Sequence, residues 1–374
     1  MIRPGPCFSL ENLEFRLARL FGAFYEGEIW TTGYELTRDE PGELRVISLK
    51  FSAPKIWSRM RFWVHAVLRG IRLRRRNTGP MVVVSYDPFT SGTAGLVLKW
   101  LTGARFVVEV NGSYGSRNTF VESKASLAGG LKRRLMALVS VPVLRSADTV
   151  KLLYPGQLEG LPVDEESLPV VRFFNSVDTQ RYGAPPTRSQ EDVILFAGHP
   201  FLLKGVDVLI EAFSRLQPEF PSWRLILMGF DLENGARRAG VNVPERTDFL
   251  GAQRPDVVEE WMERCKIFVL PSRSEAMGRV LLEAGLKGRA RVASAVGGIP
   301  HYIRDDIDGL LFPPGDTAAL TASLRRLMTT PELRERLEKE ARRSSHEQFT
   351  EAGYVDRYDQ MIREVSSLNS SSSA

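Results

Sequence analysis

Short apolar runs alternate with longer amphipathic segments along the first half of the chain. The runs have the length and β-branched composition of buried strands, whereas the longer segments repeat their apolar residues at helical spacing. We therefore predict strands at 27–33, 43–49, 81–86, 104–110 and 149–154, and helices at 10–25, 55–76 and 129–147. Pro142 is expected to bend or break the last helix. Strands that are apolar throughout and separated by helices indicate a parallel sheet covered on both faces.

The alternation restarts after a Pro-rich polar stretch, which we interpret as a linker at 184–190. In the second half we predict strands at 193–198, 223–229, 266–272 and 290–298, and helices from Val206, near Arg279, and at 317–328 and 331–345. The predicted fold is thus α/β with two domains, at 1–183 and 191–346. A final helix within 347–366 is predicted to pack back on the first domain, and the Ser-rich residues 367–374 are predicted to be disordered.

Composition and charge narrow the class of protein. The net charge of +5 favours an anionic partner. Two cysteines provide no disulfide framework, and the N-terminus lacks the apolar region of a signal peptide, so we expect a cytoplasmic protein. No apolar run reaches the roughly 18 residues of a membrane span. The four histidines are scattered, without metal-ligand spacing, so no metal site is predicted.

Three segments of the second domain follow predicted strands and should meet at one edge of its sheet, where open parallel sheets bind ligands. The first, 196–205, contains Gly198 and ends in Lys204-Gly205, an ammonium at a strand-to-helix turn that suits a phosphate. The second, 274–285, places Ala276, Met277 and Gly278 before a helix, where backbone N–H groups favour an anion. The third, 294–303, contains two consecutive glycines that allow a ligand to approach the backbone.

These segments carry a family resemblance. "PSRSEAMGRVLLEAG" resembles the E-x7-E signature of the retaining glycosyltransferases of family 4 (glycosyl transferases group 1). The resemblance continues in "FAGHPFLLKGVDVLIEAF", "VGGIP", "DGLLFPPGD" and "FFNSVDTQRY". It covers residues 170–330 closely and the first domain only loosely. It implies the GT-B fold, in which two Rossmann-like domains face each other across a cleft that holds the active site.

The resemblance also implies roles for individual residues. Glu283 would bind the ribose of a UDP- or GDP-linked sugar, Glu275 would face the donor sugar, and Lys204 would neutralise the diphosphate leaving group. Catalysis would be independent of metal, with no cofactor besides the donor substrate, and the acceptor would be a glycan or a lipid-linked precursor. Gly5 would touch the diphosphate, with the backbone around Gly198, Gly205 and Gly278 beside it.

Two positions depart from the family's pattern. His199 stands where the family usually has arginine, so the second cation at the phosphate would be either a protonated His199, which we keep among the candidate catalytic residues, or Arg279. Asn111 stands where the family often has a histidine near the acceptor, so a histidine-assisted step is left without its residue. Asn111 itself is a candidate catalytic residue with a role at the acceptor, although Asn111-Gly112 would also suit a simple turn.

Other interpretations stay open at this point. Arg279, Glu283 and Lys287 are spaced by four residues, so an exposed salt-bridged stripe would explain Glu283 without any ligand. A nucleotide-sugar epimerase would share the architecture but would need further acid–base residues at the sugar. A membrane-surface binding protein with a decayed transferase site is the alternative from another functional class.

The predicted helix at 55–76 is strongly basic, and no Asp or Glu occurs from Leu44 to Tyr86. Helical spacing places one apolar face toward the sheet: Ile56, Met60, Trp63, Val64, Val67 and Ile71. It places a cationic face outside, together with Phe62 and Leu73: Lys55, Arg59, Arg69 and Arg76. Such a face suits an anionic membrane surface, although a solvated face explains it as well. No nucleic-acid recognition motif accompanies the charge, so nucleic acid is not an expected partner.

Overall fold

The computed structural model describes residues 2–4, 25–33, 44–50, 55–114 and 127–367. The chain divides into two compact units. Unit 1 comprises Met1–Gly112, Gly130–Asn175 and Glu351–Ala374, and unit 2 comprises Ser113–Gly129 and Ser176–Thr350. Unit 2 thus begins before the stretch predicted as a linker, 184–190. The predicted helix at 10–25 and the predicted disordered tail lie largely outside the described residues.

Unit 1 is built on a parallel sheet in the order β3-β2-β1-β4-β5-β6-β7. Its strands are β1 (Ile2–Pro4), β2 (Gly27–Gly33), β3 (Leu44–Lys50), β4 (Val82–Ser85), β5 (Arg105–Glu109), β6 (Thr149–Leu152) and β7 (Val170–Arg172). The three-residue β1 pairs in parallel with both β2 and β4, so it occupies the centre of the sheet despite its shortness. The strands predicted at 27–33 and 104–110 correspond closely to β2 and β5.

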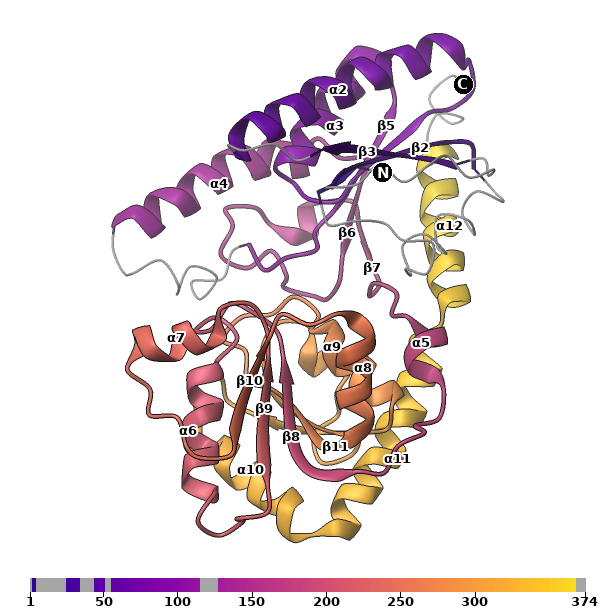
Figure 1. Ribbon diagram of the computed structural model, residues 1–374. Helices are drawn as coiled ribbons and strands as arrows, with labels where there is room; N and C mark the ends of the chain where they lie inside the picture. Colours follow the sequence, from indigo (N-terminus) through magenta and orange to yellow (C-terminus); the bar gives the residue numbers. More distant parts are fainter. Residues whose placement is uncertain (1, 5–24, 34–43, 51–54, 115–126, 368–374) are drawn as a thin grey trace. The chain divides into compact units, whose positions relative to one another are not determined.

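Helices flank this sheet: α2 (Lys55–Arg76), α3 (Thr90–Thr102) and α4 (Leu127–Arg145), together with α12 (Glu351–Ser367) at the end of the chain (Figure 1). Alternate residues of β5 serve opposite faces, as strand geometry requires. Phe106 packs against Gly95 of α3, whereas Val107 joins a core cluster with Tyr358 and Met361 of α12. The last helix of the chain is therefore part of unit 1.

The orientation predicted for α2 is correct for the buried Val67 but wrong for several other residues. Phe62, predicted outside, is only 2% exposed, whereas Met60 and Val64, predicted against the sheet, are 53% and 48% exposed. The buried face instead runs through Ser58, Phe62, Ala66 and Gly70, at intervals of four residues. A Cβ atom at Gly70 would lie 2.5 Å from Leu98 of α3, so small residues on this face allow the two helices to approach closely. A count of large apolar residues missed this face.

Two other details of unit 1 differ from prediction. Helix α4 continues through Pro142, which lies on an exposed part of the helix, where water can satisfy the carbonyl that the missing N–H leaves. Arg69, predicted on the outer face of α2, is not simply solvated, because its guanidinium donates three hydrogen bonds of 2.7, 2.9 and 3.1 Å to the carboxylate of Glu28.

Unit 2 contains a second parallel sheet, in the order β10-β9-β8-β11-β12-β13. Its strands are β8 (Glu191–Ala197), β9 (Arg224–Met228), β10 (Thr247–Gly251), β11 (Cys265–Leu270), β12 (Ala290–Ser294) and β13 (Leu310–Phe312). Its helices are α5 (Thr179–Gly183), α6 (Val206–Leu216), α7 (Leu232–Ala239), α8 (Pro255–Arg264), α9 (Arg279–Leu286), α10 (Thr317–Thr329) and α11 (Pro331–Gln348). Helix α6 lies on one face of the sheet and α8 and α9 on the other (Figure 1).

The predicted fold class, α/β with two parallel-sheet domains, is confirmed. Within the described ranges, no helix is both long enough and apolar enough to span a bilayer.

Candidate functional site

The candidate site of unit 2 lies at the carboxyl ends of β8, β11 and β12, which are neighbours in the sheet. Because parallel strands all end at the same edge, the loops that follow these three strands are brought together there. Main-chain hydrogen bonds tie them to one another. The N–H of Arg273, after β11, donates to the carbonyl of Leu203, after β8, at 2.8 Å. The N–H of Gly298, after β12, donates to the carbonyl of Ala276 at 3.0 Å.

The loop after β8 presents Lys204 immediately before helix α6. It turns into the helix at Gly205, whose φ of +67° lies in the left-handed region. A Cβ atom at this position would lie 1.9 Å from the carbonyl oxygen of Pro271, so only glycine fits both the backbone angle and the space. The guanidinium of Arg273 fixes the same loop, donating to the carbonyl of Leu202 at 2.6 Å and to both carboxylate oxygens of Asp207.

Lys204 and Glu275 form an ion pair at this edge, Nζ to Oε2. Their side chains are only 19% and 13% exposed. The same carboxylate accepts hydrogen bonds from the Ser272 hydroxyl and the Ala276 N–H, each 3.3 Å long. The pair is therefore held in place from both sides. An ammonium with a single carboxylate partner retains two further N–H donors, and these can serve an anionic ligand.

Helix α9 begins beside this pair. Its N-cap, Gly278, also has a φ of +67°, which turns the chain sharply after Met277. The hydroxyl of Tyr302 donates to the carbonyl of Met277 at 2.6 Å. Burial raises the pKa of Tyr302 well above its usual value, so this hydroxyl remains a neutral donor. The start of the helix is thus fixed from behind, and the positive end of its dipole favours an anion at this position.

Glu283 lies one turn into α9 and is largely buried, with its side chain 12% exposed. Its carboxylate is 3.6 Å from the guanidinium of the half-exposed Arg279. Lys287, the third member of the proposed stripe, is fully buried and pairs instead with Glu259 and Glu263, at 2.8 and 3.0 Å. The exposed stripe is therefore wrong as an explanation of Glu283, because neither Glu283 nor Lys287 faces solvent.

Tyr182, at the end of the short helix α5, lies close enough to Glu283 to be affected by its charge. Burial raises the pKa of Tyr182 far above its usual range, and the carboxylate of Glu283 raises it further. Tyr182 is therefore a neutral, buried neighbour of Glu283.

The remaining predicted site residues have varied surroundings. Gly198 directly follows β8, and its N–H donates to the carbonyl of Met228 at 2.9 Å. His199 is exposed beside it. Gly5 lies outside the described residues. Asp178 caps α5 by accepting a hydrogen bond from the N–H of Arg181 at 3.0 Å.

Asn111 belongs to unit 1, where its side-chain amide is fully used. The amide nitrogen donates to the carbonyl of Tyr86 and to the carboxylate of Glu109, both at 3.0 Å, and the amide oxygen accepts from Asn175 at 2.7 Å. The acceptor role predicted for Asn111 remains a prediction. The structure shows a residue that orders its surroundings.

Asn111 forms part of a buried polar network that sequence analysis missed. Glu109 and Lys151 are register partners on β5 and β6, and both are fully buried. Lys151 donates to Asn175 and lies 4.6 Å from the ring centre of Phe173, while Tyr358 of α12 donates to Glu109 at 2.8 Å. The available signal was a charged residue next to the apolar residues of each strand, with Glu109 at the end of β5 and Lys151 within β6.

Among the residues that the structure describes, no group of three His, Cys, Asp or Glu side chains has the arrangement of a metal site.

The sequence matches two family models. The first, described as "Glycosyl transferases group 1", matches residues 182–344. The second, described as "Glycosyl transferase 4-like domain", matches residues 16–161. Together they cover most of both units.

Individual proteins are similar over shorter or more divergent stretches. D-inositol 3-phosphate glycosyltransferase from Streptomyces bingchenggensis is 32% identical over 170 residues, which cover 42% of this chain and 36% of that protein. This chain spans between 33% and 42% of the length of three such curated relatives.

Two solved structures are similar over nearly the whole chain. Sucrose-phosphate synthase from Thermosynechococcus elongatus has a TM-score of 0.75 at 18% identity and covers 97% of this chain and 98% of its own. Anabaena HepE, solved in complex with UDP and glucose, has a TM-score of 0.70 at 14% identity, with the same coverage. At such identities the likeness concerns the fold.

Proposed function

This chain belongs to the group 1 glycosyltransferases of the GT-B fold, and from that premise we propose that it moves a sugar from a nucleoside diphosphate to an acceptor with retention of the anomeric configuration. The observation that carries the proposal is the ion pair of Lys204 with Glu275 beside the start of α9. A cation, a carboxylate and a helix N-terminus are thereby placed together at the carboxyl edge of a parallel sheet.

In this proposal Lys204 receives the charge that develops on the leaving diphosphate. Without donor, Glu275 holds the ammonium in position. With donor, the diphosphate shares that ammonium and accepts hydrogen bonds from the first N–H groups of α9. Because these N–H groups already point toward the position where negative charge develops, they lower the activation barrier without having to reorganise. Arg279, at the helix start, supplies the second cation that His199 replaces in the family's pattern, so transfer proceeds without a metal ion.

The two glutamates divide the recognition of the donor. Glu283 accepts hydrogen bonds from the ribose hydroxyls, and its low exposure makes these bonds stronger than bonds made in open solvent. Glu275 contacts hydroxyl groups of the transferred sugar, since it is held 3.3 Å from both Ser272 and the N–H of Ala276. Whether uridine or guanosine carries the sugar is a question for a donor screen.

We propose that the acceptor is a lipid-linked or polysaccharide glycan precursor and that unit 1 contacts the cytoplasmic face of a membrane. The exposed face of α2 supports this, because it presents Trp57, Met60, Val64 and Leu68 in a helix with eight Lys or Arg and no acid. A helix that is both cationic and apolar toward solvent binds anionic bilayer surfaces.

The test is a transfer assay with labelled UDP- and GDP-sugars, a bacterial lipid extract and EDTA. We expect nucleoside diphosphate release with label in the lipid or polysaccharide fraction, and NMR of the product should show the anomeric configuration of the donor. Lys204→Met protein is the control. Release no greater than with Lys204→Met would refute the transferase, and inversion or loss of activity in EDTA would refute the mechanism. Conversion of the donor alone into another nucleotide sugar would indicate an epimerase.

A further inference from the structure

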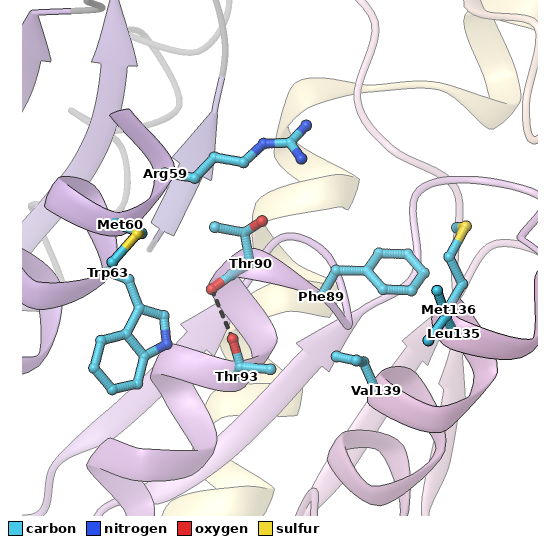
Figure 2. Close-up of a pocket in the computed structure, with 9 residues that line it drawn as sticks. All are labelled: Arg59, Met60, Trp63, Phe89, Thr90, Thr93, Leu135, Met136 and Val139. Atoms are coloured by element: carbon cyan, nitrogen blue, oxygen red, sulfur yellow. Dashed lines mark hydrogen bonds between the residues drawn. The ribbon is translucent and has the colours of Figure 1, made fainter. Parts of the chain in front are cut away.

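An open groove of about 410 Å³ lies among α2, the start of α3, and α4 of unit 1 (Figure 2). Met60 and Trp63 form one wall, and Leu135 and Val139 form the other. Phe89, the N-cap of α3, lies between them, and Arg59 stands at the α2 side of the opening. The volume falls in the range of about 300–1,000 Å³ that small-molecule sites occupy, and the lining is almost wholly apolar.

The three helices that line the groove carry charge of one sign. Helices α2, α3 and α4 contain no Asp or Glu, although together they carry many lysines and arginines. Arg59 lines the groove, and Arg134 lies one residue before the lining residue Leu135 on α4. Both side chains are exposed, and neither forms an ion pair or hydrogen bond within the part of the chain that the structure describes. An occupant that complements this surface must be apolar in its body and anionic at one end.

Apolar side chains continue outside the groove on both flanking helices. Trp57, Val64 and Leu68 extend along α2, and Leu138 extends along α4. A large exposed apolar patch bordered by arginines is unusual on a protein that meets only water. A groove, a surrounding apolar patch and exposed arginines together match an anionic lipid at a membrane surface that inserts one hydrocarbon chain into the groove.

We propose that this groove binds the hydrocarbon chain of an anionic membrane lipid, with the phosphate of the headgroup at Arg59. The chain would contact Met60, Trp63, Phe89 and Val139. This inference rests on the proposed contact of unit 1 with a membrane and names the lipid class that the contact selects. It does not depend on the donor site of unit 2.

A short-chain lipid below its micelle-forming concentration distinguishes binding of one lipid in the groove from adsorption of the protein to a membrane surface, because monomeric lipid forms no bilayer. We therefore choose dihexanoyl phosphatidylglycerol as the probe, with glycerophosphoglycerol as the headgroup alone and dihexanoyl phosphatidylcholine as the uncharged match. Methyl NMR of methionine-labelled protein reports occupancy directly. Met60 and Met136 line the groove, whereas Met228 and Met262 lie in the core of unit 2.

We expect dihexanoyl phosphatidylglycerol to shift the Met60 and Met136 methyl signals saturably and to leave those of Met228 and Met262 unchanged. Val139→Trp fills the groove and should weaken this binding at least tenfold. Leu138 is adjacent to Val139 but more exposed, at 71% against 41%, so Leu138→Trp should change the affinity less than twofold. Met60→Trp, which fills the groove from the opposite wall, repeats the test in case Val139→Trp does not fold. Arg59→Gln should reduce the preference for phosphatidylglycerol over phosphatidylcholine.

The proposed lipid site would be refuted if the headgroup alone bound as tightly as dihexanoyl phosphatidylglycerol, or if both groove-filling variants bound that lipid with unchanged affinity. Binding to anionic vesicles without binding of the monomer would also overturn it, while leaving general membrane contact in place. UDP and GDP affinities measured on Val139→Trp should match the unmodified protein. Failure of the lipid site and failure of the donor site are therefore observed separately.

Discussion

Replacement of Glu283 by glutamine tests the role of the most enclosed carboxylate of the site. The side chain keeps its shape and loses its charge. If Glu283 accepts hydrogen bonds from ribose hydroxyls, the substitution weakens a contact that persists from the ground state to the transition state. The KM for the donor should then rise while kcat stays nearly constant.

The size of the effect follows from the surroundings of Glu283. Hydrogen bonds to a charged partner contribute about 1.5–3 kcal/mol, which corresponds to a rise in KM of roughly 10- to 150-fold. The existing contact with Arg279, at 3.6 Å and with a half-exposed guanidinium, is an i, i+4 pair on a helix. Such pairs contribute only about 0.3–0.5 kcal/mol to stability, and loss of this pair alone would leave donor KM unchanged.

The assay compares donor KM and the urea unfolding midpoint for Glu283→Gln and for a matched control, Glu233→Gln. Glu233 forms an exposed i, i+4 pair with Arg237 on α7, at 2.6 Å. We expect the control to change neither quantity appreciably. If Glu283→Gln also leaves donor KM unchanged and merely lowers the midpoint slightly, Glu283 has a structural role and the ribose contact is refuted.

Three further predictions concern the framework of the two units. Gly205→Ala should lower the free energy of unfolding by more than the roughly 1–2 kcal/mol of a left-handed non-glycine residue, because its Cβ atom would meet Pro271. Gly103→Ala, with a φ of +68° and open space around its Cβ atom, should lower it only by that amount. Urea unfolding compares the two variants, and equal losses of stability would contradict the clash. Tyr358→Phe should destabilise unit 1 by about 1–3 kcal/mol, because the buried carboxylate of Glu109 loses a 2.8 Å hydrogen bond; unchanged unfolding would show that water replaces it. Burial alone would raise the pKa of Glu263, but hydrogen bonds from Lys287 and Thr187 hold it below its usual 4.5. The stability that Glu263 contributes is therefore present above about pH 4.5 and lost as pH falls further. The melting temperature of Glu263→Gln should fall less steeply with pH in that range than the melting temperature of the unmodified protein.

The architecture could be predicted from sequence because its signals are local. Buried strands such as 191–197 and 265–270 are short apolar runs, and the glycines at 205 and 278 mark the turns that follow them. In a parallel sheet, the order of strand and helix then places those turns at one edge. The position of Lys204 near the start of α9 thus followed from periodicity and topology.

Two features that depend on tertiary packing were not predicted. The buried face of α2 is set by its contact with α3, so small residues such as Ala66 and Gly70 were more informative than the large residues Met60 and Val64. The pairing of Lys204 with Glu275 joins residues 71 positions apart, and no local pattern specifies it.

The same limit applies to buried charge. Lys151 lies within β6 and Glu109 ends β5, but only their neighbours in the sheet and Tyr358, 249 positions away from Glu109, explain why their burial is tolerated. Lys287 was assigned to an exposed stripe on spacing alone, whereas α8 supplies its two carboxylate partners. Side chains contributed by distant segments decided each of these cases.

Calorimetric titration of UDP and GDP into unmodified protein and Lys204→Met tests the central claim most directly. Lys266→Met is the matched control, because Lys266 also pairs with one carboxylate, that of Asp192, but at the amino ends of the strands. We predict that one nucleoside diphosphate binds the unmodified protein, that Lys204→Met weakens this binding by roughly 10- to 150-fold through loss of about 1.5–3 kcal/mol, and that Lys266→Met leaves it unchanged. Equal affinity in the unmodified and Lys204→Met proteins, or no binding of either nucleotide, would contradict the account.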